Sequence, residues 1–186
     1  PVYDQQTIAA LAKYHPEAKV HLKIDTGMNR LGILPNQVDH FAKLLKKYPR
    51  LNVTGIYSHF SQADDKRAND FTKKQIKTFK LVIKRFENHG FKFKWKHISA
   101  TSGTQRLKDP EFNLIRLGLG FYGISPFSKN TDENKELENN LQPALRFITH
   151  LAQIKEIKKG AEISYGGTYK APKNMTIGIL PVGYYD

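Results

Sequence analysis

Apolar runs of strand length alternate with amphipathic helical segments through the first two thirds of the chain. Strand–helix–strand repeats of this length imply parallel strands joined by right-handed crossovers. Such a set of strands must close on itself or be covered, so we expect an α/β fold, either a doubly wound sheet or a β/α barrel. Strands are predicted at 20–24, 53–60 and 91–99, with a last strand-like run at 114–124, and helices at about 4–14, 35–48 and 64–89, with a short one from 101.

Small, polar or ionisable residues follow each predicted strand. They are Asp25-Thr26-Gly27, Ser58-His59, Ser99-Ala100-Thr101 and, within the last run, Arg116. In both candidate folds the carboxyl ends of the strands meet on one face, and this face carries the chemistry. The repetition therefore predicts one shared site rather than four unrelated turns.

The net charge of +13 raises nucleic acid as a partner. The densest basic segment, 73–96, argues against that class of partner. Its residues Ile76, Phe79, Ile83 and Phe86 recur at helical spacing, so the lysines between them belong on a solvated face. No helix-turn-helix, zinc-finger or RNP signature accompanies them, and we expect no nucleic-acid binding.

Composition limits the remaining classes. The 186 residues are 39% apolar, as in globular proteins, and contain no apolar run long enough to span a membrane. Cysteine is absent, which excludes disulfides and cysteine-based sites and is compatible with a reducing cytoplasm. No signal peptide is recognisable, and because the first residue is not Met we expect the chain to begin inside a longer protein.

A change in composition predicts the domain organisation. Residues 1–127 would form the α/β domain, and the polar segment 128–140 would be a linker. Beyond it, apolar and polar residues alternate at period two, so 141–186 would begin an all-β domain.

Several residues could carry chemistry. Arg116 precedes Gly118 and Gly120, and it is either a salt-bridge partner or a donor to an anion or a ring nitrogen. The hydroxyl of Thr101 and free N–H groups nearby could bind phosphate. His59, Tyr165 and Tyr184 have structural alternatives in packing. No carboxylate pair and no metal-ligand spacing stand out.

Five segments of the chain resemble the alanine racemase family, in that family's order and at about its spacing. The resemblance covers essentially the whole chain, and the segments that carry it are LKIDTGMNRLG (22–32), YSHF (57–60), NLIRLGLGFYGISP (113–126), ISYGGTY (163–169) and ILPVGYYD (179–186). The resemblance implies the second half of a TIM-like β/α barrel that binds pyridoxal 5′-phosphate (PLP), followed by the start of a carboxyl-terminal β domain. It also implies interconversion of L- and D-alanine for bacterial cell-wall (peptidoglycan) synthesis.

The resemblance assigns roles to the cations. Arg30 would hydrogen-bond the PLP phenolic oxygen and meet the substrate carboxylate. Lys23 matches a lysine that is often carbamylated, which would turn it into an anion facing Arg30. Arg116 would donate to the pyridine nitrogen and keep it unprotonated, because arginine does not readily give up a proton.

The remaining matches are in the phosphate site, the bases and the entryway. Tyr165 would be one of two bases and would reach the active site of the other subunit, so a homodimer with shared active sites is implied. Its pKa must fall for that role, and Arg116 and His59 could lower it. Thr101, Gly118 and Leu119 would bind the PLP phosphate, Tyr184 would line the substrate entryway, and His59 belongs to the network around the cofactor.

The family's Schiff-base lysine has no counterpart in these 186 residues and would lie upstream. We therefore expect the chain by itself to be inactive and to fold poorly, since half a barrel exposes sheet edges. Two alternatives stay open: a PLP-dependent racemase of broader specificity or a decarboxylase relative, and a non-catalytic basic binding module.

Overall fold

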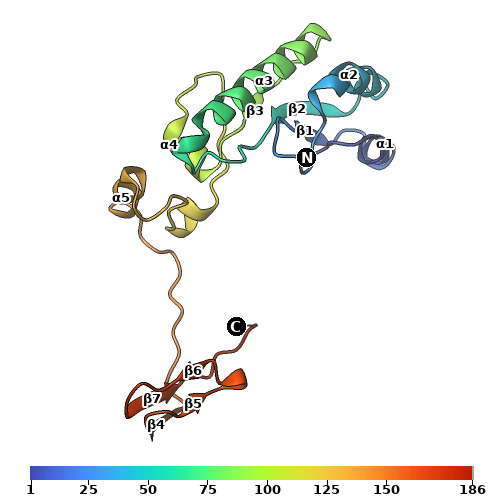
Figure 1. Ribbon diagram of the computed structural model, residues 1–186. Coiled ribbons are helices and arrows are strands. Elements are labelled where there is room, and N and C mark those ends of the chain that lie inside the picture. The colour runs from blue at the N-terminus through green and yellow to red at the C-terminus, as the bar shows by residue number, and fades with distance from the viewer. Residues whose placement is uncertain (186) are drawn as a thin grey trace. The chain divides into compact units, whose positions relative to one another are not determined.

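The computed structural model describes residues 1–185, which form two compact units. The first unit is Pro1–Ala144 and the second is Leu145–Asp186, and each is described by itself below (Figure 1).

The first unit is built on three parallel strands in the order β1-β2-β3. They are β1 (Lys19–Lys23), β2 (Asn52–Tyr57) and β3 (Trp95–His97). The last residues of all three strands are in register, because Tyr57 pairs with both Lys23 and His97. The parallel α/β class predicted from the alternation is confirmed, and the carboxyl ends of the strands lie side by side.

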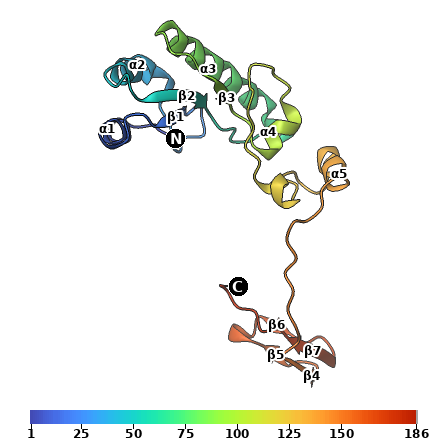
Figure 2. The ribbon, with the colours of Figure 1, turned by 180° about the vertical axis from the view of Figure 1, so that it is seen from behind.

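Helices connect these strands. Asp4 caps the first of them, its carboxylate accepting a hydrogen bond of 2.7 Å from Thr7 N. Figures 1 and 2 show α2 and α3 next to each other on one face of the sheet. The helices of the first unit are α1 (Gln5–Tyr14), η1 (Pro35–Gln37), α2 (Val38–Lys46), η2 (Lys66–Ala68), α3 (Asn69–Asn88), α4 (Thr101–Arg106), η3 (Leu119–Tyr122) and α5 (Asp132–Glu138).

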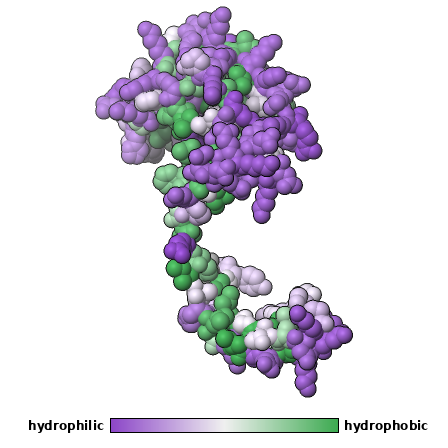
Figure 3. All heavy atoms as spheres, turned by 90° about the vertical axis from the view of Figure 1, so that its left-hand side faces the viewer, coloured by the Kyte–Doolittle hydropathy of each residue, from purple (hydrophilic) through white to green (hydrophobic). Residues whose placement is uncertain are grey.

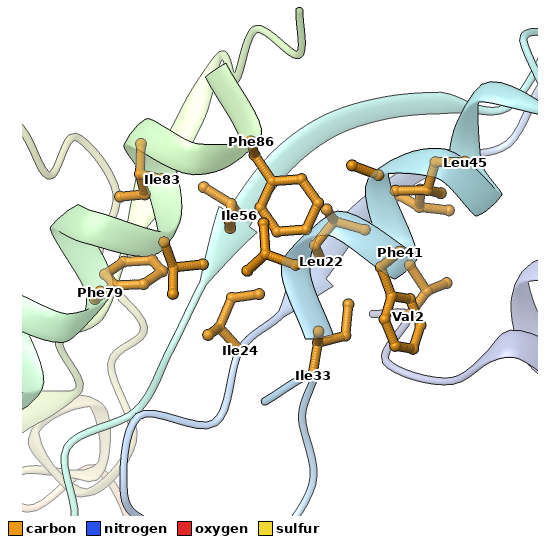
Figure 4. Close-up of a cluster of buried hydrophobic side chains, with 14 of the residues drawn as sticks. Val2, Leu22, Ile24, Ile33, Phe41, Leu45, Ile56, Phe79, Ile83 and Phe86 are labelled. Carbon is orange, nitrogen blue, oxygen red and sulfur yellow. The ribbon is translucent and has the colours of Figure 1, made fainter. Parts of the chain in front are cut away.

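The hydrophobic core lies between the sheet and these helices (Figure 4). Leu22 and Ile56 from the strands are fully buried there against Phe79 and Phe86 of α3 and residues of α2. Side chains alternate along a strand, so the neighbours of Leu22, His21 and Lys23, lie on the opposite face of the sheet. The sheet thus has one apolar face covered by helices and one polar face.

The lysines of α3 lie where the sequence predicts them. Lys73, Lys77 and Lys84 are exposed, while Phe79, Val82, Ile83 and Phe86 are buried. Figure 3 shows polar and charged side chains over much of the visible surface of the first unit. Among residues 1–185, no helix is long and apolar enough to cross a membrane.

The strand-like run predicted at 114–124 is wrong as a strand. The segment stays extended beside β3 only at its start, where Asn113 N donates to Lys96 O (3.0 Å) and Arg116 N donates to Ser99 O (3.2 Å). It then turns into η3 (Leu119–Tyr122), which ends at Gly123 with φ of 75°. Three glycines within six residues remove the side chains that would stabilise a strand.

Residues 128–140, assigned to a linker by composition, contain helix α5. Thr131 caps it by accepting a hydrogen bond from Asn134 N (3.2 Å). Oε1 of Glu133, on its first turn, lies 3.0 Å from Lys66 Nζ and 3.6 Å from Arg106 Nη2. These ion pairs hold α5 against η2 and α4 of the same unit. The boundaries of the predicted division at 127 and 141 stay a prediction.

The second unit contains two antiparallel strand pairs. β4 (Gln153–Ile157) pairs with β7 (Met175–Ile179), and β5 (Glu162–Ile163) pairs with β6 (Tyr169–Lys170) around the turn η4 (Tyr165–Gly167). The all-β character expected from period-two alternation is confirmed for this unit. Residues 141–152, which share the alternation, form no strand.

Candidate active site

The polar face of the sheet carries an aromatic and cationic cluster. The rings of Tyr57 and His97 stack with their centroids 4.9 Å apart and 2° between their planes. The guanidinium of Arg116 lies over Tyr57, 4.9 Å from its centroid, and the ammonium of Lys23 lies 6.0 Å from it. A π-face attracts cations, so Tyr57 helps to hold both groups on this face.

Arg116 is held by neutral acceptors. Its Nη2 donates to Ser58 O (2.8 Å), His59 Nδ1 (2.9 Å) and Ile98 O (3.2 Å). Among residues 1–185 no carboxylate forms a salt bridge with it. Burial lowers the pKa of Arg116, yet arginine remains a cation at any physiological pH. Among the described residues the salt-bridge alternative finds no carboxylate, and neutral acceptors hold the guanidinium instead.

His97 continues the contact network inward. Its Nδ1 contacts Arg116 Nη1, and because arginine can only donate, this nitrogen carries no proton. The other ring nitrogen, Nε2, is then free to donate to His21 Nδ1 at 2.9 Å. Burial, Arg116 and His21 lower the pKa of His97 from 6.5 to about 3, so the ring is neutral at physiological pH. The same reasoning gives His59, which accepts from Arg116 through Nδ1, its proton on Nε2.

A carboxylate organises the loop that follows β1. Asp25 is 6% exposed, and its Oδ1 accepts hydrogen bonds from Gly27 N (2.9 Å), Met28 N (2.9 Å) and Asn29 N (3.1 Å). Its Oδ2 accepts from Arg30 N at 2.9 Å. Burial raises the pKa of Asp25, but the four backbone N–H groups outweigh burial, so the pKa lies below its usual value. The Asp25 carboxylate therefore stabilises the backbone of the loop that carries Arg30.

The backbone of this loop requires glycine at two positions. Gly27 and Gly32 adopt φ of 127° and 148°, which side chains disfavour. A Cβ on Gly32 would also lie 2.5 Å from Asp25 N, because the loop closes through a bridge between Ile24 and Ile33. Both glycines therefore lie in tight turns that other residues would strain.

Lys23 lies among cations. Burial lowers its pKa first, followed by Arg30 and Arg116, whereas Asp25 raises it. Burial, Arg116, Arg30 and Lys23 likewise lower the pKa of His59. The structure therefore brings Lys23, Arg30, His59 and Arg116, all chosen from the sequence, into one electrostatic neighbourhood of positive potential.

Thr101 and the glycine-rich segment form a second part of this neighbourhood. Thr101 Oγ1 accepts from Gly118 N and Gly120 N, each at 3.2 Å. Two backbone N–H groups thus converge on one oxygen, and nothing lies within 4 Å of the place where a Cβ on Gly118 would be. Leu119, between the two glycines, starts η3. Thr101 and Gly118 are thus in hydrogen-bond contact, and their predicted roles at the cofactor phosphate stay predictions.

Tyr165 and Tyr184 lie in the second unit. Their side chains are 95% and 100% exposed. Tyr165 follows Ser164, whose φ is 62°, and precedes Gly166 and Gly167, whose φ values are 72° and 57°. Three positive φ values around one residue hold Tyr165 outward on the turn between β5 and β6. Its predicted role and that of Tyr184 stay predictions.

Three residues that matter here were not selected from the sequence: His97, Tyr57 and Gln75, the last of which donates to Thr26 Oγ1 and His59 O. A weak signal existed for His97, because Ser99 follows it by two residues and both must then lie on one face of the strand. Gln75 had no signal, since a glutamine on a lysine-rich helix reads as a surface residue.

Comparison with known proteins agrees with this geometry. The family "Alanine racemase, N-terminal domain" matches residues 2–126, and "Alanine racemase, C-terminal domain" matches 144–186. Alanine racemase of Desulforamulus reducens is 36% identical over 182 residues, 96% of this chain and 48% of the relative. Alanine racemase 1 of Bacillus subtilis is 38% identical over 167 residues, 89% of this chain and 41% of the relative. The chain thus spans about half the length of these relatives.

Solved structures show the same likeness. Alanine racemase from D-cycloserine-producing Streptomyces lavendulae superposes with a TM-score of 0.80 at 28% identity, covering 100% of this chain and 49% of that one. Alanine racemase of Clostridium difficile 630 gives a TM-score of 0.79 at 29% identity, covering 100% and 48%. The family matches extend over most of the chain and include every strand that carries the site, and we conclude that this chain belongs to the alanine racemase family.

Proposed function

We propose that the complete protein containing this chain interconverts L- and D-alanine with PLP as cofactor and supplies D-alanine for peptidoglycan. The observation that carries the proposal is Arg116, a partly buried cation on the polar face with no carboxylate partner among the described residues. Such a cation suits a ring nitrogen that must accept a hydrogen bond without taking the proton. A relative from Bacillus anthracis, 30% identical with a TM-score of 0.76, was solved with bound L-Ala-P, which supports alanine as substrate.

The donors of this site fit PLP. Thr101 Oγ1 accepts from Gly118 N and Gly120 N, so its hydroxyl hydrogen could donate to a phosphate oxygen. Gly118 N, shared between Thr101 and the phosphate, and Leu119 N would add backbone donors, and Arg116 would donate to the pyridine nitrogen. Arg30 would donate to the phenolic oxygen and to the substrate carboxylate. When bound, PLP supplies an electron sink that makes the Cα proton of the substrate acidic.

Arg116 limits how strong that sink becomes. Its pKa, although lowered by burial, stays far above that of a pyridine, so the proton remains on the guanidinium. His59 and His97 accept from it as neutral rings and cannot withdraw its charge. Arg116 would therefore hold the ring nitrogen of PLP unprotonated, which would favour brief proton exchange over side reactions such as transamination.

Lys23 suits carbamylation. Its lowered pKa increases the fraction of neutral amine, the form that attacks carbon dioxide. The amine nitrogen bonds the carbon of CO₂ and releases one proton, and the lysine becomes an anion. That anion would face two cations, Arg30 and Arg116, where a protonated lysine is repelled by both.

Tyr165 would act as one of two bases, delivered by the partner subunit. Its 95% exposure in this chain fits a side chain that completes the site of another copy. There it would hold or return the Cα proton on one face of the substrate, with its phenol pKa lowered by cations such as Arg116. Tyr184, fully exposed, would line the entry to the same site. We accordingly propose a homodimer with shared active sites, and the cytoplasmic location stays a prediction.

A racemase of broader specificity stays the second candidate. The basic surface does not argue for nucleic-acid binding, because the lysines of α3 form the solvated side of an amphipathic helix, opposite its buried residues.

The test uses the complete protein. Purified with PLP, it should show cofactor absorbance and should interconvert L- and D-alanine, measured by circular dichroism or a coupled D-amino-acid assay. Serine and lysine serve as competing substrates and separate alanine specificity from broad specificity. Absence of both cofactor absorbance and racemisation, together with salt-sensitive binding of DNA, would favour the non-catalytic alternative.

A further inference from the structure

Helix α3 buries one polar side chain among apolar ones. The buried stripe of this helix is Gln75, Phe79, Val82, Ile83 and Phe86. Gln75 is 0% exposed. A buried amide destabilises a fold unless hydrogen bonds satisfy it, so the partners of Gln75 indicate what it does.

The hydrogen-bonding capacity of this amide is fully used. Nε2 donates to His59 O at 3.1 Å and to Thr26 Oγ1 at 3.3 Å. Oε1 accepts from Ser61 N at 3.1 Å and lies 3.4 Å from Ser61 Oγ. Because Ser61 N can only donate and His59 O can only accept, the orientation of the amide is fixed by its partners.

These partners belong to the two loops that carry the site. Thr26 lies in the loop after β1, which also carries Arg30, and His59 and Ser61 lie in the loop after β2. The hydroxyls of Thr26 and Ser58 are 2.7 Å apart, which ties the two loops directly. Gln75 therefore joins one helix to both strand ends at the level of the polar cluster.

We propose that Gln75 is a positioning residue, which fixes the main chain at His59 so that the imidazole accepts from Arg116. The link is short: Gln75 Nε2 donates to His59 O, and Arg116 Nη2 donates both to His59 Nδ1 (2.9 Å) and to Ser58 O (2.8 Å). Gln75 touches neither substrate nor cofactor in this arrangement. The proposal deepens the proposed function, and its catalytic consequence rests on that function.

An apolar side chain would fill the same space without doing this. Met in place of Gln75 would pack against α3 and the sheet but leave Ser61 N and His59 O without partners. Unpaired backbone groups move toward water or toward other partners. The loop after β2 would then lose its fixed backbone conformation, and the contact between His59 and Arg116 would be lost with it.

The experiment compares Gln75→Met with Val82→Ala in the complete protein. Val82 is 1% exposed on the same stripe of α3 and its side chain has no polar atom, so its variant controls for lost packing. The first readout is the titration of the His59 imidazole by NMR, with and without PLP, the signal being identified with His59→Gln. The second is kcat and KM for alanine in both directions.

Gln75→Met should raise the pKa of His59 toward 6.5 and lower kcat at least tenfold, with KM within about twofold of wild type. Val82→Ala should lower only the thermal midpoint. An unchanged His59 titration and kcat in Gln75→Met would overturn the proposal, whatever happens to stability.

If Gln75→Met does not fold, Gln75→Glu takes its place, since it keeps the length and the acceptor for Ser61 N but loses the donor to His59 O. The same two readouts then decide, and failure of both variants to fold would show a purely structural role. A complete protein without racemase activity would contradict the proposed function, while the His59 titration would still decide the role of Gln75.

Discussion

Substitution of Asp25 by Asn tests how the loop carrying Arg30 is held. The carboxylate accepts four backbone N–H groups. Hydrogen bonds to a charged acceptor contribute about 1.5–3 kcal/mol each and neutral ones about 0.5–1.5 kcal/mol. Asn keeps one neutral oxygen for three of these donors, and its own N–H₂ group would face Arg30 N. Because three bonds share Oδ1, we expect the free energy of unfolding to fall by about 3–5 kcal/mol.

The measurement is thermal unfolding of the complete protein at several pH values. At about 2 °C per kcal/mol, the loss corresponds to a midpoint lowered by about 6–10 °C near neutral pH. The pKa of Asp25 is below 3.8 in the folded state, so its contribution is present above 3.8 and is lost as the pH falls through the folded value. The difference between wild type and Asp25→Asn should therefore shrink in strong acid.

Asp70→Asn is the matched control, because the Asp70 side chain is 100% exposed and its one ion pair, with Lys73, is 3.7 Å long. Its midpoint should stay close to wild type. Asp25→Asn should also raise the KM for alanine, since Arg30 loses its fixed backbone. If Asp25→Asn melted within about 2 °C of the Asp70→Asn control at neutral pH, the assignment of the loop to this carboxylate would be refuted.

Three further changes test the site. Tyr165→Phe in the complete protein should slow proton exchange from one alanine enantiomer far more than from the other and leave PLP bound, as isotope exchange would show; equal loss in both directions together with the cofactor would point to a structural role. Arg116→Glu should shift the absorbance of bound PLP to longer wavelength and increase transamination, and an unchanged spectrum would contradict the electronic argument. His97→Asn should flatten the pH dependence of the free energy of unfolding. The folded pKa of His97, about 3, lies below the unfolded value of 6.5, so the wild type loses up to about 1.4 kcal/mol per pH unit as the pH falls below 6.5. An equally steep loss in the variant would exclude His97 as its source.

Much of the fold was predictable because local signals agreed. Period-two and period-3.6 patterns placed β1, β2, α2 and α3 close to where they lie. The run at 114–124 failed because its apolar residues look like a strand, whereas its glycines decide the backbone. Helix α5 was missed because its seven residues have almost no apolar face and depend on a cap at Thr131 and on contacts with Lys66 and Arg106.

The candidate site divides in the same way. His59, Thr101 and Arg116 were selected because polar residues at the carboxyl ends of parallel strands must share a face. The motif resemblance added Lys23 and Arg30 and gave all five their predicted roles. No local pattern could select the groups that hold them. His21 and His97 are 76 positions apart in sequence, and their contact exists only because β1 and β3 flank β2.

The sequence by itself determined the α/β class, the face that carries the chemistry, the family and the cations at the strand ends. The class and the shared face follow from periodicity and residue types, which are local properties, and the family follows from the resemblance of five motifs. The tertiary structure alone decided three points. Arg116 has neutral acceptors in place of a carboxylate, the Asp25 carboxylate accepts backbone N–H groups of one loop, and Gln75 is buried beneath the site. Each depends on which distant groups come within about 3 Å, the range in which a hydrogen bond forms.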